Sequence, residues 1–171
     1  MLSRLLVIAA AAFMILAAPA QAAELNFTAA LNGRQDPTIT GSAATGTATF
    51  SVNTEARTID VMLSVNGISL DGLYDHVIHA GVGPVHLHLY AADGEISLLV
   101  PFAYGPAYAE TANGFTLMVS GLSYAEGAAL LGSNVSFEAF VASLGTDFVY
   151  LNIHTDAFND GEISGRLVRA G

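Results

Sequence analysis

Four of the five histidines of this chain lie in one short segment, His76–Tyr90, which reads HVIHAGVGPVHLHLY. Within it, His86 and His88 alternate with aliphatic residues. If this stretch is a β-strand, the aliphatic side chains face the core, and both imidazoles face the opposite side with their Cα atoms about 7 Å apart. Two imidazoles at this spacing can reach one Cu(II) or Zn(II) ion, so the pattern indicates metal-binding chemistry.

Two ligands alone make a weak site, and a working one needs a third or fourth. His154 is one candidate, because it alternates with aliphatic residues on an expected strand, Val149–Thr155, and His79 is another. The metal hypothesis therefore uses His79, His86, His88 and His154 with copper or zinc. The alternative interpretation is structural: His79 and His154 fix a turn or a strand edge, and His86 and His88 are solvated.

No catalytic motif accompanies these histidines. The chain has no cysteine, and it contains no G-x-S-x-G, P-loop or H-E-x-x-H pattern. The sequence therefore gives no support for an enzyme. A redox enzyme built on the same histidines is a third alternative, and it requires the metal site first.

The elements that must position these residues are strands. From Leu25 onward apolar and polar residues alternate with period two, and Gly, Asn, Asp and Pro clusters separate the alternating runs. This pattern predicts an antiparallel all-β fold, a Greek-key β-sandwich or barrel in a single domain, with at most one short helix at Tyr124–Leu131. After alternating runs that begin near Leu25, Ala48 and Ile59, the pattern predicts further strands at Tyr74–His79, Val85–Tyr90, Ile96–Val100, Phe115–Val119, Val135–Val141, Val149–Thr155 and Glu162–Val168.

The first 23 residues have the pattern of a cleavable signal peptide. A positive charge at Arg4 precedes an apolar run, and small residues surround Gln21 in an A-x-A arrangement. The run is short for a bilayer span, so we expect no membrane anchor after cleavage. The expected organisation is a signal peptide at 1–23 and one β-domain at 24–171, exported to the periplasm or outside a bacterial cell.

The charge and the absence of cysteine limit the classes of partner that this chain is expected to bind. The formal net charge is −10, and all five basic residues are arginines. Such an acidic chain repels phosphate backbones, which argues against nucleic acid. The lack of cysteine suits a bacterial exported domain held together by its core. We expect a protein or cell-envelope ligand, and neither its identity nor the oligomeric state follows from the sequence.

Three segments in order resemble the CHRD domain, which is named after chordin. They are residues 27–53, the histidine-rich segment and Tyr150–Leu167. The last is the most specific, because the family's ending is close to Y-V-N-I-H-T, a turn, then G-E-I-R-G-Q-L. Ser164 and Arg166 depart from that ending, and Val77 stands where the family has the first histidine of H-I-H-x-G.

The resemblance implies an all-β domain and little chemistry. Bacterial members have no agreed activity, and chordin itself binds growth factors. The function expected from the sequence is thus an exported, non-catalytic binding module of the cell envelope or extracellular space. The alternative is a periplasmic copper- or zinc-binding protein that uses the histidine cluster.

Overall fold

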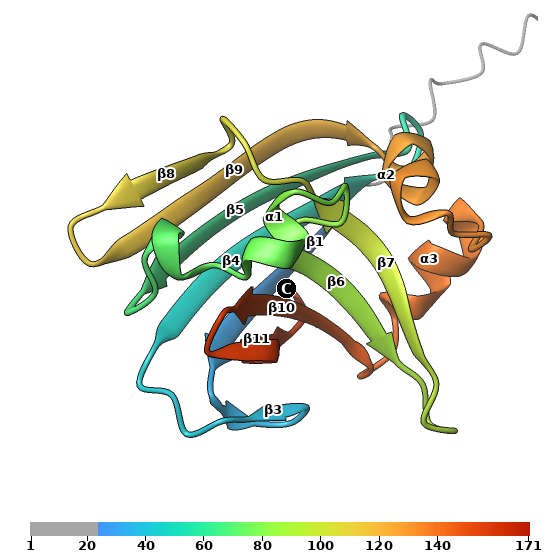
Figure 1. The fold of residues 1–171 in the computed structure, drawn as a ribbon. Coiled ribbons are helices and arrows are strands. Elements are labelled where there is room, and N and C mark those ends of the chain that lie inside the picture. Colours follow the sequence, from blue (N-terminus) through green and yellow to red (C-terminus); the bar gives the residue numbers. More distant parts are fainter. Residues whose placement is uncertain (1–23) are drawn as a thin grey trace, which may run out of the picture.

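A computed structural model describes residues 24–171, which form one strongly curled antiparallel sheet (Figure 1). One half of the sheet runs outward from the first strand. In spatial order its strands are β1 (Glu24–Asn32), β4 (Thr45–Asn53), β5 (Thr58–Asn66), β9 (Gly114–Ser123) and β8 (Tyr108–Thr111).

The other half lies on the opposite side of β1. In spatial order from β1 its strands are β11 (Phe158–Arg166), β10 (Val149–Thr155), β6 (Val85–Tyr90) and β7 (Ile96–Phe102). Two short pieces, β2 (Arg34–Gln35) and β3 (Thr38–Ile39), form a hairpin outside the main sheet, and β12 (Val168–Arg169) pairs with β1. The prediction of an antiparallel all-β domain is confirmed. The expected signal peptide lies outside the described residues.

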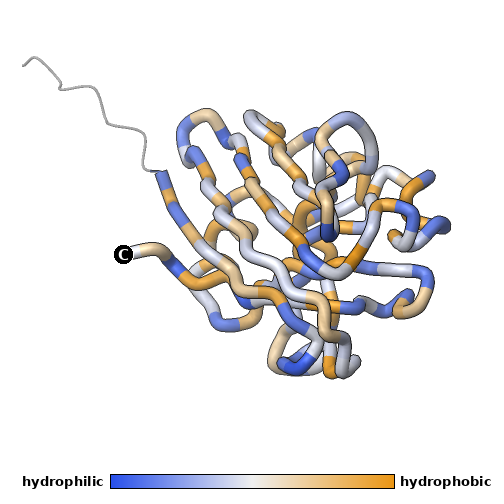
Figure 2. The backbone as a smooth tube through the Cα atoms, turned by 90° about the vertical axis from the view of Figure 1, so that its left-hand side faces the viewer, coloured by the Kyte–Doolittle hydropathy of each residue, from blue (hydrophilic) through white to orange (hydrophobic). Residues whose placement is uncertain are grey.

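The alternating sequence pattern explains how the strands build the core. Along β4 and β5 every second side chain is buried, and those between them are exposed or half-buried. Figure 2 shows the same alternation of hydrophobic and hydrophilic residues along the backbone. On the far half of the sheet, Leu87, Leu151 and Ile153 are fully buried in the same core. The curled sheet thus closes around one apolar interior.

The helices differ from prediction at two places. The helix expected at Tyr124–Leu131 is α2, which begins after the Ser123 cap and ends at Gly132 in the left-handed conformation. The strands expected at Tyr74–His79 and Val135–Val141 are wrong. These segments hold the short helices α1 (Asp75–Ile78) and α3 (Phe137–Ser143), so the limit of one helix is wrong too.

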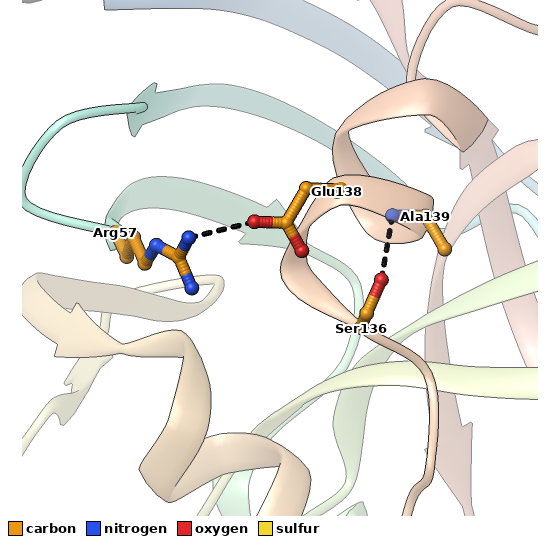
Figure 3. A network of polar contacts seen from close by, with 4 residues as sticks. All are labelled: Arg57, Ser136, Glu138 and Ala139. Carbon is orange, nitrogen blue, oxygen red and sulfur yellow. Dashed lines mark hydrogen bonds and ion pairs between the residues drawn. The ribbon is translucent and has the colours of Figure 1, made fainter.

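Local capping and packing explain the change at α3. The Ser136 side chain accepts a hydrogen bond from the backbone N–H of Ala139 (Figure 3), which starts a helical turn where the apolar alternation suggested a strand. Phe137 and Phe140, one turn apart, then both pack against Tyr124 of α2. The aromatic cluster therefore needs a period near 3.6 rather than 2.

An exposed ion pair links this aromatic cluster to the β4–β5 hairpin. Arg57 reaches Glu138 at 2.6 Å (Figure 3), and its guanidinium lies 5.3 Å from the ring centre of Phe137. These contacts hold α3 against one end of the sheet.

Within the described residues, no helix has the length and apolar character that a membrane crossing requires.

Candidate metal centre

Three of the predicted histidines come together on the face of the sheet opposite the core. Strands β6 and β10 are antiparallel neighbours, and the register places Asn152 opposite His86. His88 follows His86 on the same face of β6, and His154 follows Asn152 on the same face of β10. One ring nitrogen from each of the three histidines lies within 4.8 Å of the other two.

The rings also touch one another. The ring centres of His86 and His154 are 4.4 Å apart and stacked, and those of His86 and His88 are 4.6 Å apart. The centres of His88 and His154 are 5.8 Å apart. Three residues from two strands therefore form one compact imidazole cluster.

The cluster is buried, whereas the structural interpretation expected His86 and His88 to be solvated. The exposed fraction is 4% for His86 and 8% for His154, and His88 is half-buried. The aliphatic neighbours do face the core as predicted, so the sheet here is buried on both faces.

The segment of residues 33–42, which includes the β2–β3 hairpin, covers part of this second face. The buried Thr38 donates a hydrogen bond from its hydroxyl to Ser164 Oγ on β11, at 2.7 Å. Thr40 donates to the backbone carbonyl of Glu162, at 2.8 Å. Ser164 is itself the register partner of Asn152, so the hairpin is anchored beside the histidine row.

Two of the imidazoles are oriented by backbone carbonyls. His86 Nδ1 lies 2.9 Å from the carbonyl oxygen of Gly83, and His154 Nδ1 lies 2.8 Å from that of Asn159. A carbonyl oxygen only accepts, so each Nδ1 carries the hydrogen and each Nε2 keeps its lone pair. This is the arrangement that histidine ligands show around protein-bound metals.

Gly83 is required for the first of these contacts. Its φ is +67°, and a Cβ at this position would overlap the carbonyl group of Phe102. Only glycine fits such a turn without strain. The G-P-V motif therefore places the carbonyl that orients His86.

Unpaired buried atoms gather at this one place. Across residues 24–171, the buried side-chain nitrogen and oxygen atoms without a hydrogen-bond partner are His88 Nδ1 and Nε2, His154 Nε2 and Asn152 Oδ1. Buried polar atoms in folded proteins almost always have partners, so a cluster of four such atoms is unusual and makes this place a candidate binding site.

Burial keeps the imidazoles neutral. Desolvation, followed by the nearby His154 and His88, lowers the pKa of His86 to about 3. Desolvation and His154 lower the pKa of His88 to about 4. Burial also lowers the pKa of His154, although its hydrogen bond to Asn159 and the charge of Asp160 oppose this. At pH 7 all three rings are therefore in the form that binds metals.

The structure does not bring His79 into the cluster. His79 caps the C-terminal end of α1 with its side chain 78% exposed, and its Nε2 lies 3.6 Å from Asp75 Oδ1. The segment that was expected to be a strand is a helix, and this helix holds His79 at the surface.

Asn152 and Tyr90 also belong to the site, although the sequence did not predict them as part of it. Asn152 is fully buried, and its Nδ2 donates a hydrogen bond to the Tyr90 hydroxyl at 2.8 Å. The signal was present in the sequence, because Asn152 shares a strand face with His154. The burial of Asn152 depends on neighbouring strands, and the alternating apolar–polar sequence pattern does not reveal it.

Comparison with known proteins gives one match, to a family model. The family model described as the CHRD domain matches residues 27–167, a span that includes all three clustered histidines. No curated protein and no solved structure matches the chain.

Proposed function

The chain belongs to the CHRD-domain family, and we propose that it is an exported, non-catalytic binding protein whose ligand is a copper or zinc ion held by His86, His88 and His154. The observation that carries the proposal is the convergence of three neutral imidazoles, among which both ring nitrogens of His88 and Nε2 of His154 are buried without a hydrogen-bond partner. A purely structural cluster would satisfy those nitrogens with protein donors or acceptors.

The energetic argument favours a ligand. Each unpaired buried polar atom costs the folded protein about 1–3 kcal/mol. A metal ion that accepts the lone pairs of His88 and His154 would remove much of that cost. The unpaired atoms therefore lower the stability of the metal-free protein, and a bound cation would restore that stability.

The donor set selects the metal class. Imidazole nitrogen suits Zn(II) and Cu(II), whereas Ca(II) and Mg(II) require oxygen ligands. The described cluster contains three histidines and no carboxylate or thiolate. Three protein ligands leave one position of a tetrahedral ion for a solvent molecule.

Titration of the purified protein with Zn(II) and Cu(II), in competition with a chelator of known affinity, tests the proposal. We expect one ion per chain and a rise in the unfolding temperature, because the ion binds the folded state. His88→Gln should weaken binding by ~100-fold or more, since it removes a ligand and the loss of an outer-shell partner alone typically costs about 10–100-fold.

His79→Gln is the matched control, because His79 is exposed and outside the cluster. It should bind as the unchanged protein does. Affinity no tighter than that of an isolated H-x-H peptide, or equal loss in both variants, would overturn the proposal.

The exported location is supported by the sequence at residues 1–23 and by the absence of cysteine. Mass spectrometry of the protein recovered from a bacterial periplasm or culture medium should find an N-terminus at Ala23 or Glu24. Recovery of an uncleaved chain from the cytoplasm would contradict the proposed location.

A further inference from the structure

A single metal ion does not satisfy all the unpaired atoms of the cluster. Each histidine offers an ion one nitrogen, so His154 Nε2 and one ring nitrogen of His88 become ligands. The second ring nitrogen of His88 then carries a hydrogen and remains buried without an acceptor. Asn152 Oδ1 is a buried acceptor without a donor. The two remaining atoms are complementary.

The position of the Asn152 amide fits this pairing. Asn152 lies opposite His86 and diagonal to His88 across the β6–β10 ladder, a separation that side chains can bridge. Its Nδ2 reaches the hydroxyl of Tyr90, which follows His88 on the same face with ring centres 5.5 Å apart. The amide nitrogen of Asn152 therefore contacts the residue that neighbours His88 on this face.

The space around the amide is made by Gly161. A Cβ at this position would lie 3.5 Å from Asn152 Nδ2 and 3.8 Å from His154 Cε1. The amide of Asn152 and the ring of His154 thus lie side by side under the backbone of β11.

We propose that Asn152 is a positioning residue of this centre: when a metal ion takes one ring nitrogen of His88, the other ring N–H donates to Asn152 Oδ1. The inference rests on the proposed metal-binding function. With this bond made, the four unpaired atoms of the cluster all have partners. The three imidazoles then each donate their second N–H to an oxygen, as metal-ligating histidines generally do.

Tyr90 fixes the direction of the amide. Because the Tyr90 hydroxyl accepts from Nδ2, the NH₂ group is held on that side and Oδ1 on the other. Without this bond the amide of Asn152 could rotate. Its NH₂ group would then face the ring N–H of His88, and two hydrogen-bond donors would oppose each other. Tyr90 therefore acts on His88 through Asn152.

His88 differs from its two neighbours in a way that permits a test. His86 and His154 donate to backbone carbonyls, which no substitution removes. The acceptor for His88 is a side chain. Replacing outer-shell partners of this kind typically weakens metal binding 10–100-fold.

The experiment compares Zn(II) and Cu(II) affinities of the full protein with those of four variants. Asn152→Leu keeps the volume and removes the acceptor, so we expect affinity to fall about 10–100-fold. Asn152→Asp keeps an acceptor, so affinity should return to within a few-fold of the unchanged protein. Tyr90→Phe should give a smaller loss, because it frees the amide to turn.

Ser164→Ala is the matched control for a merely structural effect. Ser164 is fully buried beside Asn152 on the same face, and its side-chain partner is Thr38. This variant should unfold more easily and still bind metal as the unchanged protein does. NMR of the zinc-loaded protein should show a slowly exchanging His88 ring N–H that disappears in Asn152→Leu.

The outcomes separate the two proposals. If the unchanged protein binds no metal, the proposed function fails. If it binds and Asn152→Leu binds within twofold of it, the metal site stands and the role of Asn152 is refuted. Failure of Asn152→Asp to restore affinity, or an equal loss in Ser164→Ala, would also refute that role.

Discussion

The outer face of the sheet differs between its two halves. On β1, β4 and β5 this face is wet: Thr28, Thr49 and Met62 lie side by side in register and are all exposed. On β6, β10 and β11 the corresponding row is His86, Asn152 and Ser164, and all three are buried. Both halves have the same alternating sequence pattern. Alternation thus tells which residues share a face, and it does not tell whether that face meets water.

The difference has a physical cause in a segment outside the main sheet. Residues 33–42 fold back on β11, where the hydroxyls of Thr38 and Thr40 bond to Ser164 and to the backbone of Glu162. The imidazoles then shield one another by stacking. The covered row therefore lies away from bulk solvent, whereas the wet row does not.

Acid should have the largest effect, and it should act on the half of the sheet that carries the buried imidazoles. In the unfolded chain a histidine has a pKa near 6.5. In the folded protein the pKa values of His86 and His88 are about 3 and about 4. Below pH 6.5 the unfolded state therefore binds more protons than the folded state. The free energy of unfolding is highest above that pH and decreases as the pH falls. Metal-free protein should lose about 3 kcal/mol per histidine between pH 6.5 and 4.

Denaturant unfolding at a series of pH values measures this loss. The double variant His86→Gln/His88→Gln should show a flatter pH dependence, and His79→Gln should follow the unchanged protein because His79 is exposed. A stability that stays constant from pH 7 to pH 4 would show that the two rings are not buried as neutral groups.

The shared core under both halves gives the next largest effect. Leu151 is fully buried beneath the histidine row, whereas Met62 is 55% exposed on the wet row. Leu151→Ala should cost about 2–5 kcal/mol of unfolding free energy, through lost burial and a cavity. Met62→Ala should change it by less than about 0.5 kcal/mol. If chemical denaturation gave similar losses of unfolding free energy for the two variants, the burial of Leu151 and the exposure of Met62 would be contradicted.

Two serines on the outer face, one in each half of the sheet, should differ in their contribution to stability. Ser164→Ala leaves the buried Thr38 hydroxyl without its partner and should cost about 1–3 kcal/mol. Ser64→Ala, on the exposed row of β5, should cost less than about 0.5 kcal/mol. Urea unfolding midpoints of the two variants check this. Equal midpoints would show that residues 33–42 do not cover the row in solution.

The smallest effect is expected at the far end of the sheet. Arg57 and Glu138 form a short ion pair, but both side chains are more than half exposed. Exposed pairs contribute about 0–1 kcal/mol, so Glu138→Gln should lower stability by no more than that. The difference should shrink in high salt. A loss above 2 kcal/mol in thermal unfolding would contradict the surface character of this pair.

The sequence predicted the strands of the candidate site closely. Val85–Tyr90 and Val149–Thr155 are strands with the expected bounds, because each has strict alternation flanked by turn residues. It also placed His86, His88 and His154 opposite the aliphatic side chains. Alternation failed at Val135–Val141, where a serine cap and aromatic contacts with α2 favour a helix over a strand.

The antiparallel β-fold and the strand faces that carry the clustered histidines thus follow from local sequence, because side-chain direction in a strand depends only on local backbone geometry. Which histidines meet depends on strand pairing, since the register of β6 against β10 brings His154 to His86 and His88 and leaves His79 on a separate helix. The tertiary structure also determines that the histidine cluster is shielded from solvent. Burial depends on what packs over a strand, and the segment that covers this face lies more than a hundred residues from the β11 residues it contacts.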